Sequence, residues 1–122
     1  MVRGHRNRET GRRESLAADL ERRLAGGAPA TAAHGNTTLT LLVTNRKLDP
    51  ATLGQLGKQV HASMARAIQP FHCPEDGDVL FAVTTDEVDD EQLGAAGLGV
   101  LASELAWDAV LSSFAADPAD GA

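Results

Sequence analysis

The chain has 122 residues, which is enough for one domain and too few for a two-domain enzyme. Its charge is uneven: residues 1–36 carry seven Arg and four acidic residues, whereas residues 37–122 carry four basic and thirteen acidic residues. The strongly acidic second part excludes nucleic-acid binding as the expected function, because that function needs clustered positive charge.

The cellular compartment follows from cysteine usage and from the absence of long apolar segments. The single cysteine, Cys73, excludes an internal disulfide and favours a reducing compartment. The N-terminal sequence MVRGHRNRETGRRE lacks the apolar stretch of a secretory signal, and no segment approaches the ~20 apolar residues of a membrane helix. We therefore expect a soluble, cytoplasmic protein without a membrane partner.

The first third of the chain begins with polar residues and ends with a segment of Gly, Pro and other small residues. Residues 1–14 are rich in arginine and are expected to be disordered or solvated. Ser15 is a suitable N-cap for a short helix over residues 16–25. The segment GGAPATAAHG that follows is composed of Gly, Pro and small residues, which predicts an accessible connector.

Two strands and a helix come next. Residues 39–44, LTLLVT, are apolar nearly throughout, which predicts a central strand covered on both faces. Asp49 and Pro50 are typical of the N-cap and first position of a helix, and Pro70 predicts its end. Residues 79–84, VLFAVT, predict the second strand.

The last part of the chain predicts another helix. An acidic loop over residues 86–91 and the Gly-rich segment LGAAGLG lead to a helix over residues 100–115. Apolar residues surround much of this helix, so we expect it to be sandwiched. The order strand, helix, strand, helix assigns the chain to the α+β class. Because two strands do not form a stable sheet alone, we expect this sheet to pair with another chain or to belong to something larger.

The segment GNTT, residues 35–38, stands between the connector and the first strand. A threonine is a weak nucleophile unless a base lies beside it, but a threonine at a chain terminus carries its own base, an α-amine with a pKa of about 7.7–8.0. The Thr37 hydroxyl could create that terminus by attacking the carbonyl of Asn36, and Gly35 would permit the backbone geometry. The same residues are also typical of an ordinary turn before a strand.

Three other groups of residues are candidates for chemistry. Asp76 and Asp78 in the segment DGD are equally consistent with a turn and with functional carboxylates. His72 and Cys73 do not make a zinc site, because no CxxC or HxxxH pattern completes them. The acidic run 86–91 lacks the spacing and the glycine of a calcium loop. We therefore expect no metal or organic cofactor.

The ordered combination of GNTTLTLLVTN, LDPATLGQLGKQVHASMARAIQP and DGDVLFAVTT resembles the C-terminal part of the P1-family, peptidase S58-like enzymes. These include the L-aminopeptidase/D-esterases, the β-peptidyl aminopeptidases and the pantetheine hydrolase of thienamycin biosynthesis. The resemblance runs from Gly35 to the C-terminal helix. It implies a precursor that cleaves itself before a Ser or Thr, and an αββα sandwich resembling the N-terminal nucleophile hydrolases.

The resemblance also implies roles for individual residues. Thr37 is the nucleophile and the first residue of the β subunit, and Asn36 is the last residue of the α subunit. Thr38 helps to position the nucleophile or the scissile carbonyl. Asp76 and Asp78 lie where family members place a hydroxyl or carboxylate that orients the terminal amine. Residues 1–36 then correspond to the tail of the α subunit, and residues 37–122 to the β-subunit-like peptidase portion.

The implied reaction is hydrolysis of N-terminal amino-acid amide or small amide bonds, with a small peptide or amide as substrate and a homo-oligomer as the complete enzyme. Family members carry a much longer α segment, which supplies the oxyanion-stabilising asparagine and most of the substrate pocket. We therefore expect this chain to need a missing α-subunit portion or a partner chain, and to be nearly inactive alone. The alternative is a non-catalytic assembly subunit or an inactive truncated product, in which GNTT is only the start of a strand.

Overall fold

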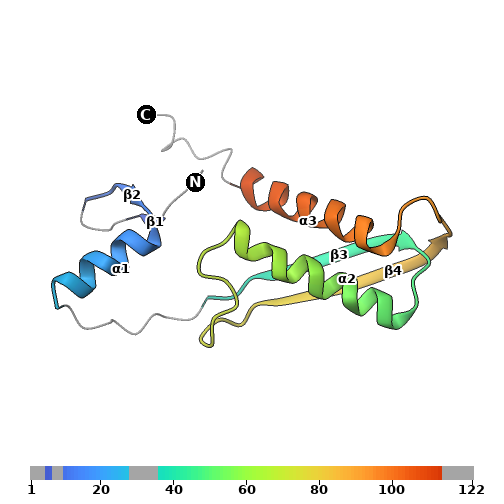
Figure 1. Cartoon of the computed structure of the whole chain (residues 1–122), viewed down its shortest axis with the longest axis horizontal. Helices are drawn as coiled ribbons and strands as arrows, with labels where there is room; N and C mark the ends of the chain where they lie inside the picture. The colour runs from blue at the N-terminus through green and yellow to red at the C-terminus, as the bar shows by residue number, and fades with distance from the viewer. Residues whose placement is uncertain (1–4, 7–9, 28–35, 114–122) are drawn as a thin grey trace. The chain divides into compact units, whose positions relative to one another are not determined.

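The computed structural model describes residues 5–6, 10–27 and 36–113 (Figure 1). The chain forms two compact units, Met1–His34 and Gly35–Ala122. In the first unit, strand β1 (His5–Arg6) pairs antiparallel with strand β2 (Arg13–Glu14). These four residues are therefore paired in strands and not disordered, while the exposed Arg13 agrees with the alternative expectation of a solvated segment.

Helix α1 (Leu16–Ala25) follows β2 and begins where the sequence predicts. The Ser15 hydroxyl caps it by accepting a hydrogen bond from the N–H of Ala18 at 3.1 Å. Asp19 is buried in this unit, and its carboxylate pairs with the guanidinium groups of Arg22 and Arg23. The buried charge is thus compensated within the same helix.

The second unit contains β3 (Leu39–Arg46), α2 (Pro50–Ser63), the 3₁₀ helix η1 (Met64–Arg66), β4 (Val79–Val88) and α3 (Ala95–Ser112). This order confirms the predicted strand, helix, strand, helix arrangement, and its mixture of helices with a small parallel sheet is consistent with the α+β class. Strands β3 and β4 are parallel, and α2 makes the crossover between them. The parallel pairing puts the first residues of both strands at the same edge of the sheet.

Helix α2 begins as predicted but ends earlier. The Asp49 carboxylate accepts a hydrogen bond from the N–H of Thr52 at 2.8 Å, and Pro50 is the first helical residue. The α-helix ends at Ser63, whose carbonyl accepts a hydrogen bond from Trp107 Nε1 at 2.9 Å. Only the three residues of η1 continue the coil, so the predicted helical end at Pro70 is wrong.

Both strands are longer than their apolar runs. Strand β4 continues to Val88, so the first residues of the predicted acidic loop belong to a strand. The register shifts between Thr44 and Arg46, and Asp86 has a φ of 60°, which together indicate a β-bulge. Beyond this point Arg46 pairs with Val88, although the three residues before Val88 are polar. Composition alone does not reveal pairing that backbone hydrogen bonds maintain.

Helix α3 begins at Ala95, inside the segment that was predicted to precede it. Gly99 is buried where α3 crosses α2, and a Cβ atom at this position would lie 2.0 Å from Gln59 Oε1. The glycine therefore permits close contact between α2 and α3. The Gly-rich composition of this segment had instead suggested a loop before the helix.

The core of the second unit lies on one face of the sheet. It contains Leu56, Val60, Met64 and Ala102 from α2, η1 and α3, and Leu42 and Leu80 of the strands pack against it. The opposite face, which we call the outer face, is apolar and exposed, with Leu39 72% and Phe81 59% exposed. Its members are Leu39, Leu41, Val43, Phe81 and Val83.

Two predictions about burial are not met within residues 36–113. β3 was expected to be covered on both faces, and the last helix to be sandwiched. Both helices pack on the same face of the sheet, so nothing among residues 36–113 covers the outer face. The outward side of α3 is likewise exposed at Val100, Leu101 and Leu105.

By length and composition alone, α3 could cross a membrane, because it has 18 residues with a mean hydropathy of 1.2. The core helix of a soluble protein often has the same composition. α3 also carries Glu104 and Asp108, and it packs closely against α2 at Gly99. Its apolar character is therefore no argument for a membrane.

Candidate active site

The parallel sheet brings together two segments that are about forty residues apart in the chain. Residues 36–38 lead into β3, and residues 76–78 lead into β4. Leu39 is paired with Val79, so the two leading segments lie beside each other (Figure 1). The five residues that the sequence predicts as site residues are thereby neighbours: Asn36, Thr37, Thr38, Asp76 and Asp78.

Backbone groups on both sides of Thr37 are hydrogen bonded to the 76–78 loop. The N–H of Asn36 donates to Asp76 Oδ1 at 3.3 Å, and the N–H of Thr38 donates to Asp78 Oδ1 at 2.6 Å. The carbonyl oxygen of Asn36 accepts a hydrogen bond from the N–H of Gly77 at 3.0 Å. Three hydrogen bonds therefore fix the backbone around the peptide bond between Asn36 and Thr37: one to its carbonyl oxygen and one from the N–H group on each side.

The two carboxylates also fix the loop that carries them. The second oxygen of Asp76 accepts from the N–H of Cys73 at 3.0 Å, and the second oxygen of Asp78 accepts from the N–H of His72 at 2.7 Å. His72 has a φ of 56°, a left-handed conformation that histidine tolerates better than most residues. Each carboxylate thus connects its own loop to the segment that leads into β3.

Gly77, between the two aspartates, is in close contact with Thr37. A Cβ atom at position 77 would lie 2.9 Å from Thr37 Oγ1, closer than ordinary van der Waals contact. Thr37 itself is exposed. The glycine lets the loop approach the hydroxyl, so the candidate nucleophile lies against backbone and still faces solvent.

The electrostatics of the site favour a charged Asp78. Burial raises the pKa of Asp78, but the hydrogen bonds from His72 and Thr38 and the charge of His72 lower it by more. The net pKa lies below the usual carboxyl value, so this side chain is a carboxylate at neutral pH. Burial and the neighbouring Asp76 raise the pKa of the Cys73 thiol. Cys73 is therefore a neutral thiol and a poor nucleophile near pH 7.

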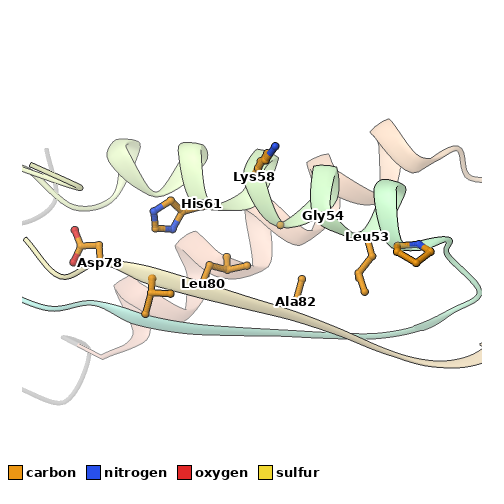
Figure 2. Close-up of a pocket in the computed structure, with 10 residues that line it drawn as sticks. Leu53, Gly54, Lys58, His61, Asp78, Leu80 and Ala82 are labelled. Carbon is orange, nitrogen blue, oxygen red and sulfur yellow. The ribbon is translucent and has the colours of Figure 1, made fainter.

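A groove of about 460 Å³ runs between α2 and β4 and reaches the site at Asp78 (Figure 2). Figure 2 shows His61 extending from α2 at the end of the groove where Asp78 lies. The His61 ring is 4.8 Å from the ring of His72. Burial lowers the pKa of His61, His72 lowers it further, and Asp78 opposes both. The rest of the groove is mainly apolar and is lined by Leu53, Leu80 and Ala82.

Sequence reasoning placed the carboxylates near the cleavage site but did not identify all their contacts. The hydrogen bonds of Asp76 and Asp78 that the structure describes go to the neighbours of Thr37 and to residues 72–73, not to Thr37 itself. The sequence indicates no role for Gly77 beyond a turn in the segment DGD. Its position between two aspartates was the available signal, although only the strand register shows which residue it approaches.

Comparison with known proteins identifies the family. The sequence profile of peptidase family S58 matches residues 4–119. The 6-aminohexanoate-oligomer endohydrolases of Agromyces sp. (strain KY5R) and Paenarthrobacter ureafaciens are each 44% identical over 123 residues, covering 93% of this chain and 35% of the relative. An uncharacterized aminopeptidase of Mycobacterium tuberculosis (strain ATCC 25618 / H37Rv) is 38% identical over 53 residues, covering 43% of this chain and 15% of that protein.

The chain spans about a third of the length of these endohydrolases. The match to the family profile nevertheless extends over nearly the whole chain, from the first unit through the segments around Thr37 and Asp78 to the end of α3. The resemblance drawn from the GNTT and DGD segments is thus confirmed, and the chain belongs to peptidase family S58.

Proposed function

We propose that this chain is the nucleophile-bearing part of an N-terminal nucleophile amidase that cleaves itself between Asn36 and Thr37. The observation that supports this proposal most directly is the set of hydrogen bonds around that peptide bond. Asp76, Gly77 and Asp78 each hold one backbone group on its flanks. The start of an ordinary strand needs only the backbone hydrogen bonds of the sheet. It does not need two carboxylates that accept backbone N–H groups, or a glycine in close contact with the neighbouring segment.

The proposed self-cleavage consumes no reagent other than water. The Thr37 hydroxyl attacks the carbonyl carbon of Asn36, and the bond to the Thr37 nitrogen breaks as that nitrogen receives the hydroxyl proton. The product is an ester between Asn36 and the Thr37 oxygen. Water hydrolyses this ester, which leaves a carboxylate on Asn36 and restores the hydroxyl beside a free Thr37 amine.

The freed amine then supplies the base for turnover. With an ordinary pKa of about 7.7–8.0, an α-amine is partly unprotonated near neutral pH and can accept the hydroxyl proton. Thr37 attacks the carbonyl of an amide substrate, releases the amine product and forms an acyl-enzyme ester that water cleaves. Thr38 and Asp78 position the nucleophile through the hydrogen bond between them.

The substrate class we propose is a linear amide: an N-terminal amino-acid amide, a small peptide or a short oligoamide. Hydrolysis of amides is the activity that the family name and the names of the relatives share. The mainly apolar groove between α2 and β4, which ends at Asp78, would suit the methylene chain of such a substrate.

We further propose that a partner segment or chain supplies the part of the family's sequence that this chain does not span. Its sheet would pack on the outer face, completing an αββα sandwich. Five exposed apolar side chains on two adjacent strands support this docking position, since soluble proteins rarely leave such a surface uncovered. The same exposed face favours the second candidate function, a non-catalytic assembly subunit.

Intact-mass measurement tests the self-cleavage. The wild-type chain, expressed alone and with the upstream portion of a family relative, should yield a piece that begins at Thr37. Thr37→Ala should abolish that piece, while Thr38→Ala, a matched change at the next residue, should slow its formation without abolishing it. If the wild-type chain stays uncut in both expressions, or if Thr37→Ala is still cut, the proposal is wrong.

Turnover separates the two candidate functions. The assembled protein should hydrolyse an amino-acid p-nitroanilide or a 6-aminohexanoate oligomer, and Thr37→Ser should retain part of this activity because serine keeps the hydroxyl. A complex that forms through the outer face but hydrolyses neither substrate would identify the chain as an assembly subunit.

A further inference from the structure

The carbonyl oxygen of Asn36 belongs to the bond that is cut in the proposed self-cleavage, and it accepts a hydrogen bond from the backbone N–H of Gly77 at 3.0 Å. We propose that this N–H is the oxyanion donor of the self-cleavage reaction. Gly77 is then a catalytic residue that acts through its backbone. The inference rests on the proposed self-cleavage and assigns the group that stabilises its first intermediate.

The donor acts at a defined step. When Thr37 Oγ forms its bond to the carbonyl carbon of Asn36, the π electron pair of the carbonyl moves to the oxygen. That oxygen becomes an alkoxide, and the N–H of Gly77 already points at it. When the electron pair returns, the bond to the Thr37 nitrogen breaks and the nitrogen takes the proton released by the hydroxyl. Charge on the oxygen is therefore greatest while this hydrogen bond is in place.

The loop that carries the donor is fixed before the reaction begins. The carboxylates on either side, Asp76 and Asp78, each accept two backbone N–H groups, one from the segment before β3 and one from residues 72–73. An oxyanion donor is most effective when it needs no reorganisation. Two nearby carboxylates disfavour a new negative charge, so the alkoxide depends on a donor directed at it.

Gly77 also lies beside the nucleophile. A Cβ atom at position 77 would be 2.9 Å from Thr37 Oγ1, so only glycine allows the hydroxyl and the loop backbone to be this close. The same residue therefore holds the carbonyl that is attacked and borders the oxygen that attacks it. Because Gly77 makes both contacts, its hydrogen bond to the Asn36 carbonyl differs from the other hydrogen bonds along the two strands.

The competing explanation is purely structural. The N–H of Gly77 continues the parallel ladder by one step, and the next bond of that ladder, from the N–H of Val79 to the carbonyl of Thr38, is also 3.0 Å long. The second bond is a matched control, because it has the same length and joins the same two segments but does not involve the scissile carbonyl.

Backbone ester substitution separates the two explanations. The full chain is assembled by semisynthesis with glycolic acid in place of Gly77, or with the hydroxy acid analogue of valine in place of Val79. Each change replaces one N–H by oxygen. The rate of formation of the piece beginning at Thr37 is followed by intact mass, with the upstream portion of a relative present if the wild type requires it. Thermal unfolding is measured for both chains.

The ester at position 77 should slow self-cleavage by about 100- to 1,000-fold, the usual cost of one oxyanion donor, and the ester at position 79 by no more than a few fold. Equal slowing by both esters, or no slowing at 77, overturns the inference while the proposed function stands. A wild-type chain that never releases Thr37 refutes the proposed function itself and the inference with it.

A second measurement does not require the esters to fold. In the uncleaved Thr37→Ala chain, the carbonyl of residue 36 or of Thr38 is labelled with ¹³C and its infrared amide I frequency is recorded. If the N–H of Gly77 polarises the scissile carbonyl, the frequency at Asn36 should be as low as that at Thr38, whose carbonyl accepts a hydrogen bond of the same length. A frequency at Asn36 well above that at Thr38, as for a carbonyl without a donor, overturns the inference.

Discussion

Replacing Val60 by Ala tests whether the second unit is stabilised by a core on only one face of its sheet. Val60 is 1% exposed. Removing two methyl groups costs about 1.6 kcal/mol of transfer free energy at ~0.8 kcal/mol each. The cavity adds about 1 kcal/mol, and the higher helix propensity of alanine offsets about 0.5 kcal/mol. The free energy of unfolding should therefore fall by about 2 kcal/mol, which lowers the unfolding midpoint of a domain this size by about 8–16 °C.

Val43→Ala is the matched control, because Val43 lies on the outer face and is 57% exposed. Its loss should not exceed about 0.5 kcal/mol, mostly from the lower strand propensity of alanine. Both midpoints are measured by circular dichroism at several protein concentrations, so that self-association is detected. If dilute Val43→Ala unfolds as early as Val60→Ala, the outer face is packed in the isolated chain, and the reasoning about a one-sided core fails.

Three further predictions concern the site. Gly77→Ala places a methyl group 2.9 Å from Thr37 Oγ1. Self-cleavage should slow about tenfold or more relative to Gly54→Ala, which has open space, and equal rates in mass time courses would contradict the close contact. Because its pKa is lowered, His61 favours folding only while it is neutral, so the unfolding midpoint should fall as pH drops below 6.5, and His61→Gln should flatten this dependence. The lowered pKa of Asp78 gives stability that is present above pH 3.8 and lost as pH falls through the lower folded pKa; acid titration of Asp78→Asn should lack this loss.

Local signals in the sequence predicted the starts of α1 and α2 correctly. Ser15 and Asp49 cap α1 and α2 as expected, because a cap depends on side chains within three residues of it. Strand ends were less predictable. Strand β4 continues to Val88, which pairs with Arg46 of β3, and the polar residues 85–87 before it give no indication of a strand.

Long-range contacts account for the remaining errors. Gly99 looked like a residue of a loop, whereas it lies in a helix where Gln59 approaches it. The apolar run of β3 was correctly predicted to be a strand, but which face the helices cover depends on the path of the whole chain. The exposed outer face follows from that path.

For the site, the sequence alone determined the chemical groups: a threonine after Asn36 at the start of a strand, and two carboxylates before another. Hydroxyl and carboxylate chemistry is a property of residue type, so it can be read without a structure. Only the tertiary structure decided that these groups meet, and that Gly77 faces the Asn36 carbonyl. The physical reason is the parallel register of β3 and β4, which aligns segments forty residues apart and is set by packing around the helix between them.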